Sequence, residues 1–489
     1  MEATPGGFLL VLMLVAPVTG LLLGFALGGH AARRSTLGLL PVCLAMTLVL
    51  LAGVLHARSP VVAFVGGWAP PLGLALRADG LAAAMLLTTA LIMSAIALFS
   101  RRDYHTLPGA TETRSSLAFW GFLLALWAAL NAAFLGGDLF NLFVALEMLT
   151  FGALALACLD GKATQFKAEL RYLLFALIGS VLYLLGTALL YGAYGTLDIL
   201  LLGRAARADA PTIVAAALMT VGLLGKMALF PLHLWLPAAH AGAPPDASAL
   251  LSGLVVKASY MLLLRLWFWV MPAGLLLAVA PVLPALGAAA ILFGSLVALR
   301  QARLKLLVAY STVAQIGYLF LMFRLVAGSA AGIAERAWTG GALQAISHAF
   351  AKAAMFLAAG VIARALGHDR IAELHGAARV APLSVLAFGL AGLSLMGIPP
   401  SGGFTAKWLL LQAALDSGQW WWALVIVAGG MLTGGYVFRV LNAAMRTAPV
   451  APAQPVNTTQ ERVALGLAIL SVLLGLLPLG AFGLVLIGR

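Results

Sequence analysis

Residues 222–237 read GLLGKMALFPLHLWLP and belong to an apolar run that begins at Pro211. Lys226 lies near the end of this run, with no carboxylate within four residues on either side. A charged side chain at bilayer depth costs roughly 2.5–3.5 kcal/mol on insertion scales, so this lysine requires an explanation. Pro231 and Pro237 follow it, and each proline removes a backbone donor and interrupts a helix. We therefore expect a broken membrane helix with a cation beside the break.

The composition of the whole chain indicates an integral membrane protein. Of its 489 residues, 63% are hydrophobic and only 9% are charged, whereas soluble domains carry about 25% charged residues. Uninterrupted apolar runs of about 20 residues recur from end to end, as in polytopic α-helical proteins. Segments of about ten alternating residues, which are typical of a membrane β-barrel, are not seen. The predicted fold class is an all-α polytopic membrane protein.

The apolar runs predict about fourteen transmembrane helices and leave no room for a soluble domain between them. The longest polar stretches are 101–115 and 442–461. The expected spans lie near residues 8–28, 37–56, 79–99, 116–135, 138–158, 172–193, 211–230, 247–270, 274–298, 306–326, 342–365, 381–415 (interrupted), 420–441 and 463–486.

The formal net charge of +13 arises from arginines and lysines that sit mainly in short loops, so topology explains it better than a nucleic-acid partner. The positive-inside rule makes the side with the basic loops cytoplasmic. Both termini are then expected on the outer, periplasmic side of the cell (inner) membrane. The basic residues follow odd-numbered spans and are Arg33, Arg34, Arg101, Arg102, Arg114, Lys162, Lys167, Arg171, Arg300, Arg303, Lys305, Arg364, Arg370, Arg379, Arg439, Arg446 and Arg462.

Two expected spans are interrupted by proline. Span 7 meets Pro231 and Pro237, and span 12 contains GIPPSGGF at 397–404. Corresponding breaks in two halves indicate inverted repeats with a site near the membrane midplane. We therefore predict two five-helix repeats, spans 4–8 and 9–13, which are inverted because each holds an odd number of helices. The expected regions are N-terminal helices 1–3 in 1–115, the first repeat in 116–270, the second repeat in 271–441 and a C-terminal loop and helix in 442–489.

Few charged residues lie inside the expected spans, and these few are the candidates for function. Glu147 and Lys226 are expected to form a pair, because each stabilises the charge of the other where burial favours the neutral forms. Loss of the pair would release a proton from the lysine. The alternative readings are lysines that extend to the interface and a glutamate that is only a structural partner. The candidate residues for proton translocation are Glu147, Lys226, Lys257, His348, Lys352 and Lys407.

A second group of polar residues is a candidate for relaying protons beside these charges. His348 and Lys352 are four residues apart and share a helix face, which favours a relay reading for His348 over a hydrogen-bonded core histidine. The histidines beside the first break would either relay protons or bond the carbonyls that the break frees, and both readings stay open. The candidate relay residues are His233, His240, Ser311, Gln315 and Tyr318.

The sequence contains no pattern of a cofactor, metal or catalytic site. His233 and His240 lack the spacing of a ligand pair, and no carboxylate cluster adjoins them. A dinucleotide-binding glycine motif, a phosphate loop and HExxH are all missing, so a transporter subunit without a catalytic centre of its own is expected. Cys43 and Cys158 form no CxxC, and neither a disulfide nor a haem or iron–sulfur cluster is expected.

Five long motifs resemble the antiporter-like subunits shared by respiratory complex I, membrane-bound hydrogenases and Mrp-type cation/proton antiporters. The resemblance covers nearly the whole chain and is best from about 131 to 415. The stretches GGWAPPLGLALRADGLAA (66–83) and LLYGAYGTLDI (189–199) are most similar to the D-type subunits of Mrp antiporters. The motifs are FNLFVALEMLTFGALAL, GKMALFPLHLWLPAAHAGAPPDASALLSGLVVKA, KLLVAYSTVAQIGYLFL, SHAFAKAAMFLAAG and GIPPSGGFTAKWLLL.

The resemblance implies roles for the charged residues of the first half. Glu147 and Lys226 would be the coupled ion pair of the first half-channel. Lys257 would link this pair to a central hydrophilic axis.

The resemblance also implies roles in the second half. His348 and Lys352 would continue the axis, and Lys407 would be the terminal lysine that communicates with the opposite side. Gln315 stands where some relatives carry histidine, so it is a weaker candidate for titration. Asp246 stands where a small or apolar residue is expected, and it would be either a loop or helix-cap carboxylate or a local variation of the entrance.

Three functions are therefore considered. The first is a proton-translocating subunit of an Mrp-type sodium/proton antiporter, with other membrane subunits, protons and sodium as partners. The second is a proton-pumping module of a complex I-like or hydrogenase-like redox complex. The third is a structural scaffold whose axis is inert.

Overall fold

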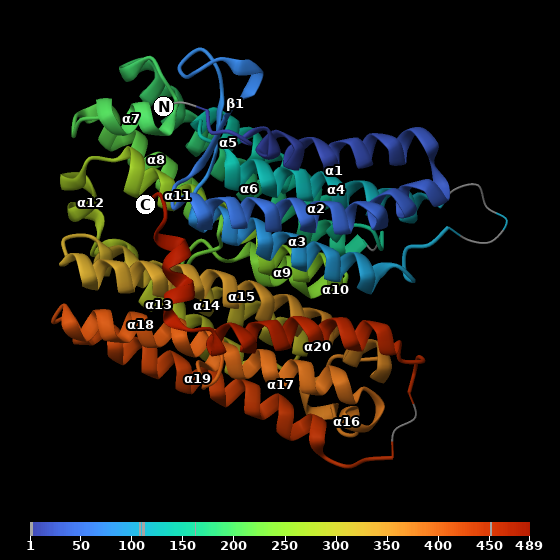
Figure 1. Cartoon of the computed structure of the whole chain (residues 1–489). Helices are drawn as coiled ribbons and strands as arrows, with labels where there is room; N and C mark the ends of the chain where they lie inside the picture. The colour runs from blue at the N-terminus through green and yellow to red at the C-terminus, as the bar shows by residue number, and fades with distance from the viewer. Residues whose placement is uncertain (1–2, 107–108, 110–112, 162, 450–451) are drawn as a thin grey trace.

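A computed structural model describes residues 3–106, 109, 113–161, 163–449 and 452–489. Lys162, one of the loop cations that indicate orientation, lies outside the described residues. The chain is almost entirely helical apart from one small hairpin (Figure 1). The elements of the first 200 residues are α1 (Phe8–Leu27), α2 (Gly29–Ala57), β1 (Val61–Phe64), the 3₁₀ turn η1 (Val65–Gly67), β2 (Ala75–Ala78), α3 (Gly80–Ser100), α4 (Arg114–Leu135), α5 (Leu139–Ala157), α6 (Ala163–Tyr194) and α7 (Ile199–Ala205).

The remainder of the chain contains long helices, two π-helical turns and several short helical turns. The elements up to residue 326 are α8 (Ala210–Lys226), α9 (Trp235–Gly242), α10 (Pro245–Leu250), the π-helical η2 (Leu251–Val255), α11 (Val256–Arg265), the π-helical η3 (Leu266–Val270), α12 (Ala273–Val279), α13 (Val282–Arg300) and α14 (Leu304–Val326). They are followed by α15 (Ala331–Leu366), η4 (Ile371–Glu373), α16 (Ala377–Val380), α17 (Pro382–Met396), α18 (Gly402–Asp416), α19 (Trp420–Met445), α20 (Thr458–Leu473), η5 (Leu474–Leu476) and η6 (Leu479–Leu486).

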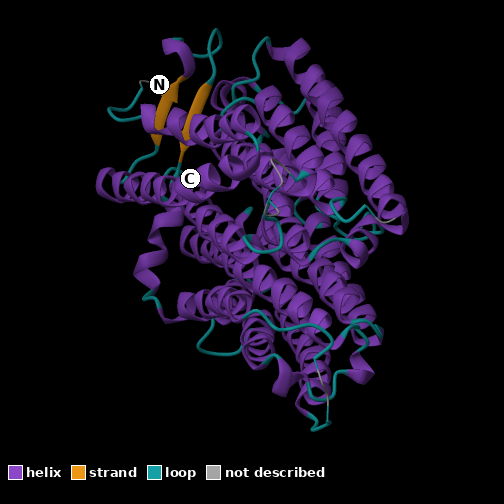
Figure 2. Cartoon of the chain, turned by 90° about the vertical axis from the view of Figure 1, so that its right-hand side faces the viewer, coloured by secondary structure: helices purple, strands orange, loops and turns teal. Residues whose placement is uncertain are grey.

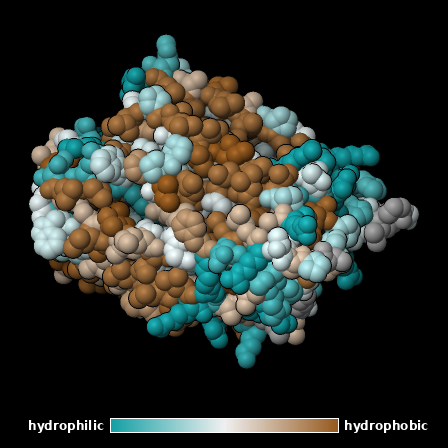
Figure 3. Space-filling model, turned by 90° about the horizontal axis from the view of Figure 1, so that it is seen from below, coloured by the Kyte–Doolittle hydropathy of each residue, from teal (hydrophilic) through white to brown (hydrophobic). Residues whose placement is uncertain are grey.

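Twelve helices of the described residues are long and apolar enough to cross a membrane. Of the two other expected segments, span 7 is the shorter helix α8, which ends before the break, and span 12 is divided into α17 and α18, so the number fourteen stays a prediction. The long helices run side by side, with the outer ones exposing apolar side chains (Figure 1). Seen from the side of the bundle that carries α17 and α19, the middle of the surface is mostly apolar, and hydrophilic side chains gather mainly at one end and along one edge (Figure 3). The protein is an integral, multi-pass membrane protein.

The most buried helices lie in the middle of the bundle. The most apolar stretch of segment 245–270 is completely buried, and those of α14 and α15 are mostly buried, whereas α1 and α19 bury about a third of theirs. A side chain on one of the central helices therefore meets protein rather than lipid. Polar groups placed there must find partners within the protein, because water is scarce.

Both predicted helix breaks are present. The first lies between α8, which ends at Lys226, and α9, which begins at Trp235, and within it Ala228 adopts a left-handed conformation with φ 55°. The second lies between α17 and α18. There Gly397 has φ 84°, and the Ser401 side chain accepts a hydrogen bond from the amide of Phe404 at 3.2 Å, which caps α18. The inverted relationship of the two five-helix groups stays a prediction.

A hairpin that the sequence analysis did not predict joins α2 to α3. β1 and β2 pair antiparallel from Val61↔Ala78 to Phe64↔Ala75 (Figure 2). The amide of Thr4 donates to the carbonyl of Val62 at 2.9 Å. The amide of Gly80 donates to the carbonyl of Ile487 at 3.0 Å. Both termini therefore lie beside the hairpin, at the same end of the bundle.

The last helix differs from the expected span 463–486. α20 begins earlier, at Thr458, where the Asn457 side chain accepts from the amide of Thr459 at 3.0 Å. It ends at Leu473, and after Pro478 the chain continues as the 3₁₀ helix η6. Proline cannot donate to a helix, so an apolar composition alone overestimated how far this helix continues.

We predict that Gly80→Ala destabilises the protein because it displaces the C-terminal segment. A Cβ at this position would lie 1.8 Å from the carbonyl oxygen of Leu484, which is far inside van der Waals contact. Overpacking of this kind costs typically about 1–3 kcal/mol. The measurement is the thermal midpoint of the purified protein in detergent. Gly53→Ala, where the new Cβ meets nothing within 4 Å, is the control and should melt no lower than the wild type; equal melting of both variants would contradict the prediction.

Candidate functional site

An ion pair joins α5 to the end of α8. The Nζ of Lys226 lies 3.2 Å from Oε1 of Glu147 and also donates to the Thr150 hydroxyl at 2.8 Å. The Ser180 hydroxyl of α6 donates to the same Glu147 oxygen. The lysine side chain is 5% exposed and the glutamate side chain 19%. Lys226 is the last residue of its half-helix, where the carbonyl ends of the helix favour a cation.

Close packing of α6 and α8 places Lys226 against α6, whose Ser180 bonds Glu147 of α5. A Cβ at Gly179 would lie 2.7 Å from the carbonyl of Gly222 and 3.2 Å from Cγ of Lys226. Glycine at both positions lets the two backbones approach, as small residues do at helix crossings in membranes. The lysine stem therefore runs along the surface of α6 toward Glu147.

His233 and His240, the two histidines beside the first break, are buried. Their ring nitrogens make no well-aligned hydrogen bond among the described residues. The His233 ring lies among aromatic rings, 5.5 Å from Phe230 and 5.1 Å from Phe293 between centroids. The His240 ring stacks on Phe356 at 4.5 Å. His233 does lie beside the backbone of Pro231 in the break, and the relay and carbonyl-bonding readings of the two histidines both stay predictions.

Trp235 begins α9, and its Nε1 donates to the carbonyl of Gly225 at 2.9 Å. The same carbonyl accepts from the amide of Ala228 at 3.2 Å, just after the end of α8. The tryptophan is thus a second donor to this helix-end carbonyl and places no charge beside Lys226.

Lys257 is completely buried on α11, in the centre of the bundle. Its Nζ donates to the carbonyl of Ser252 at 2.5 Å. Ser252 belongs to the π-helical turn η2, and such turns often occur at functional sites. The Ser252 hydroxyl lies 2.9 Å from the Thr312 hydroxyl of α14. A polar connection thus runs from Lys257 to α14.

The same stretch of α14 also contacts Lys352 of α15. The Lys352 Nζ donates to the carbonyl of Val308 at 2.9 Å and to the Ser311 hydroxyl. Because Ser311 and Thr312 are neighbours, Lys257 and Lys352 are connected through short polar groups of one helix. Ser311 is the one candidate relay residue that bonds directly to a candidate lysine.

His348 is 1% exposed, and neither of its ring nitrogens has a hydrogen-bond partner among the described residues. It interacts electrostatically with Lys257, Lys352 and Lys407, and so lies among three of the candidate lysines. Three neighbouring cations require a group between them that can exist in the neutral form. A neutral imidazole that carries one proton and accepts another meets this requirement.

Lys407 lies beside the second break. Its Nζ donates to the carbonyl of Leu395 at 2.5 Å, in the last turn of α17, and lies 4.1 Å from the ring centroid of Tyr318. Gln315 donates to the same carbonyl at 3.0 Å and accepts from Gln344 at 3.1 Å. Gln315 and Tyr318 therefore hold Lys407 in place, through a shared acceptor and a cation–π contact respectively.

The polar groups form three connected sets. The first contains Glu147 and Lys226, the second runs from Lys257 to Lys352, and the third surrounds Lys407 and Gln315. No hydrogen bond between side chains of the described residues joins Lys226 to Lys257. Tyr436, which the sequence analysis missed, extends the second set, because its hydroxyl lies beside Ser311 and Gln315. The roles of all these residues in transport stay predictions.

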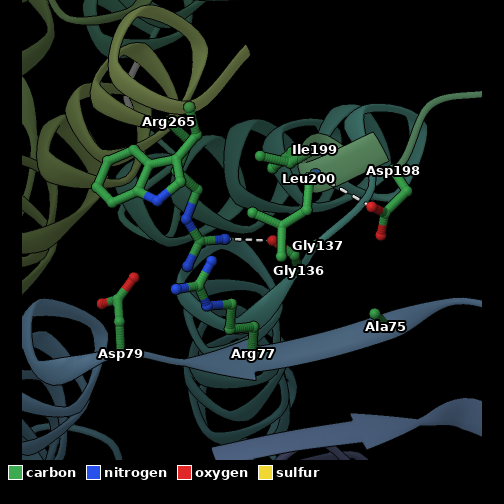
Figure 4. A pocket seen from close by; sticks show the side chains of 10 residues that line it. Ala75, Arg77, Asp79, Gly136, Gly137, Asp198, Ile199, Leu200 and Arg265 are labelled. Atoms are coloured by element: carbon green, nitrogen blue, oxygen red, sulfur yellow. Dashed lines mark hydrogen bonds between the residues drawn. The ribbon is translucent and has the colours of Figure 1, made fainter. Parts of the chain in front are cut away.

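Arg265 is a further buried charge that the sequence analysis missed. Its guanidinium donates to the carbonyls of Phe134 and Gly136 at the end of α4. Figure 4 shows it beside Arg77 and Asp79 of the hairpin region. The same criterion that selected Lys257, a charged residue within an apolar span, also selects Arg265. Its contacts indicate a helix C-cap rather than a relay, because both acceptors are helix-end carbonyls.

We predict that Arg265→Met lowers the stability of the protein by about 1–3 kcal/mol, the typical cost of leaving buried hydrogen-bonding groups unsatisfied. Methionine keeps an unbranched apolar side chain but leaves the carbonyls of Phe134 and Gly136 without this donor. The measurement is the thermal midpoint in detergent, with the exposed Arg204→Met as control. Wild-type melting of Arg265→Met would contradict the assignment as a structural cap.

Among the described residues, no group of three or more histidine, cysteine, aspartate or glutamate side chains is placed to hold a metal ion. Asp246 is buried and accepts from the Ser100 hydroxyl at 2.7 Å. It is the first-turn acidic residue of α10, which suits the helix N-terminus. These contacts fit a local helix-end carboxylate, and Asp246 also lines a polar cavity, so both readings of this residue stay predictions.

The fold and this site define a multi-pass membrane protein of transporter type. Comparison with known proteins is consistent with this class. Residues 136–433 match the family described as NADH:quinone oxidoreductase/Mrp antiporter, transmembrane. The chain belongs to this family.

Individual relatives come from both branches of the family. The chain is 37% identical over 455 residues to the N subunit of NADH-quinone oxidoreductase from Desulforudis audaxviator, covering 91% of this chain and 88% of the relative. It is 29% identical over 411 residues to the D subunit of the Na(+)/H(+) antiporter from Alkalihalophilus pseudofirmus, covering 83% and 80%. Among solved structures, a chain of the Mrp complex from a Dietzia species superposes with a TM-score of 0.88 at 26% identity, covering 98% and 96%.

Proposed function

We propose that this chain is a proton-translocating subunit of an Mrp-type sodium/proton antiporter. The observation that carries the proposal is the Glu147–Lys226 ion pair, which lies at one side of an axis of buried lysines. A fixed metal cation would be repelled by such an axis, whereas a lysine can take up and release a proton. The similarity to Mrp subunits in sequence and structure supports the same reading.

The ion pair acts as a switch. While Glu147 carries a negative charge 3.2 Å away, the ammonium of Lys226 is stabilised. When Glu147 is protonated or moves away, burial favours the neutral amine, and Lys226 gives its proton to a neighbouring acceptor.

In the second half of the axis the proton moves between Lys257 and Lys352. The Ser252 hydroxyl lies beside the Thr312 hydroxyl, and the Ser311 hydroxyl bonds Lys352. Lys257 bonds the Ser252 carbonyl, so its side chain must turn to a hydroxyl before a proton passes, and each hydroxyl can rotate between donor and acceptor roles. His348 holds the space between the lysines and accepts a proton when one of them is neutral. Lys407 is the terminal member, and it communicates with the opposite side of the membrane.

The orientation of the chain follows from its loops. The basic loops lie at the end opposite the hairpin, and we assign that end to the cytoplasm and both termini to the outer side of the cell membrane. The regions 1–115, 116–270, 271–441 and 442–489 retain their proposed assignments, with the two middle regions as inverted repeats.

Two exposed apolar surfaces are proposed as contacts with other membrane subunits of the assembly. One flanks Glu147 on α5, where Val144 is 40% and Phe151 52% exposed. The other is a groove of about 500 Å³ between α18 and α19 that is lined by Lys407, Gly430 and Met431, among others. Both ends of the axis are thus near the surface, where a neighbouring subunit would complete them.

The second candidate function is a pump module of a redox complex. The similarity to an NADH-quinone oxidoreductase subunit supports it. The two candidates share the axis and differ in the partner that drives it. The neighbouring genes separate them, because small Mrp-type membrane subunits indicate the first, and iron–sulfur and quinone or hydrogenase subunits indicate the second.

We predict that Glu147→Ala and Lys226→Ala each abolish sodium-driven proton movement by the assembled complex. Each change leaves one buried charge without its partner and removes the switch. The measurement is the pH-dependent fluorescence of a dye in membrane vesicles, with the amount of assembled complex determined in parallel. Lys167→Ala, an exposed lysine of α6, is the control and should transport normally. Normal transport by both test variants at normal levels of complex would favour the inert scaffold.

A further inference from the structure

Glu169 is a buried carboxyl group that the axis described above does not include. It lies on α6, is 1% exposed, and neither of its oxygens has a hydrogen-bond partner among the described residues. A charged carboxylate without a partner is very costly in such a place, whereas a protonated one is tolerated. A buried carboxyl group without a partner is therefore expected to be protonated most of the time and to exist as a carboxylate only briefly.

Glu169 shares a helix face with Tyr172, since the two are three residues apart on α6. The Tyr172 ring packs on Trp235 at 4.5 Å between centroids, which fixes its position beside the first helix break. Its hydroxyl interacts with the Thr150 side chain. Thr150 in turn accepts from Nζ of Lys226 at 2.8 Å. The four side chains therefore lie in an ordered series from Glu169 to Lys226.

A polar cavity of about 790 Å³ lies near this part of α6, at the end of the bundle with the basic loops. Glu169 does not line it, but Ala168, which precedes Glu169, does, and so does Gly242 of α9. A Cβ at Gly242 would lie 3.6 Å from Gln165, which is one turn before Glu169. The cavity therefore reaches the turn of α6 that carries Glu169.

Other acidic groups around this cavity are engaged in contacts of their own. Asp246 accepts from Ser100 and from its own helix end. Asp369 pairs with Arg303 at 2.9 Å. Burial and the neighbouring Asp246 raise the pKa of Tyr104 far above its usual range, so this phenol stays protonated. Glu169 combines oxygens that have no hydrogen-bond partner with a place three residues before Tyr172, whose hydroxyl interacts with Thr150 beside Lys226.

We propose that Glu169 takes up protons from this cavity and delivers them to Lys226 through Tyr172 and Thr150. A proton from water in the cavity binds the Glu169 carboxylate. The side chain of the resulting acid then rotates toward Tyr172 and donates to its oxygen, while the phenol passes its own proton to the Thr150 oxygen. The threonine hydroxyl proton passes to the neutral amine of Lys226, which becomes ammonium. Glu169 is left as a carboxylate and is protonated again from the cavity. This route rests on the proposed function, because it supplies the lysine of the ion pair.

The test uses the assembled complex in membrane vesicles and compares Glu169→Gln and Tyr172→Phe with the wild type. Both variants keep the shape of the side chain and remove the group that carries the proton. Transport is expected to fall about tenfold or more. The remaining rate should show a larger effect of D₂O than the wild type, because proton transfer then limits transport. Tyr183→Phe is the matched control on the same helix, since the Tyr183 hydroxyl bonds only to the Leu139 carbonyl at 3.2 Å.

Infrared difference spectroscopy provides a readout that does not depend on transport. The wild type should show the carbonyl band of a buried protonated carboxyl that is absent in Glu169→Gln and present in the exposed control Glu373→Gln. Wild-type transport by Glu169→Gln, or no such band, would overturn the route. If Glu147→Ala and Lys226→Ala also transport normally, the proposed function itself fails rather than only this route.

Discussion

The contact between the Lys226 ammonium and the Glu147 carboxylate is the interaction on which the rest of the site depends. Each charge would be unstable alone in the apolar interior, and removal of one partner of a buried pair is typically far more costly than the pair itself is stabilising. The close approach of α6 and α8 at Gly179 and Gly222 places Lys226 against α6, whose Ser180 bonds Glu147. The break after Lys226 then ends the half-helix where its carbonyls also favour the cation.

The remaining lysines follow a common rule. Each ammonium donates to a backbone carbonyl, at Ser252, Val308 or Leu395. The first of these carbonyls belongs to a π-helical turn and the last to the end of a half-helix, where backbone acceptors are not fully used. Helix irregularities therefore provide neutral acceptors for cations in a region where the described chain supplies few carboxylates. A neutral carbonyl stabilises an ammonium less than a carboxylate does. A lysine at such a site can therefore release its proton more easily.

Much of this arrangement could be predicted from the sequence. The breaks at Pro231 and in 397–404 and the partnership of two distant charges followed from proline chemistry and from the cost of buried charge. The hairpin could not be recognised, because its strands are four residues each and lie in a loop rich in proline and glycine. The surroundings of His233 depend on the path of the non-helical segment between α8 and α9. The spacing of apolar residues in the sequence does not predict that path.

Two buried charges were missed for different reasons. Arg265 lies inside an expected apolar span. It therefore met the criterion that selected the other charged candidates, but it was overlooked. Glu169 lies before the expected span 172–193, whereas α6 begins at Ala163 and buries it. Only charges inside an expected span were counted as buried. Because the expected span began nine residues after the start of α6, Glu169 was left out.

The most direct test of the central claim is the protonation state of Lys226 in the assembled complex. Solid-state ¹⁵N NMR of labelled lysine in lipid bilayers reports it, with the Lys226 signal assigned by its loss in Lys226→Leu. We expect an ammonium signal in the wild type and a neutral amine signal in Glu147→Gln at the same pH. An ammonium signal that is unchanged in Glu147→Gln would contradict the account, because Glu147 would then not determine when Lys226 releases its proton.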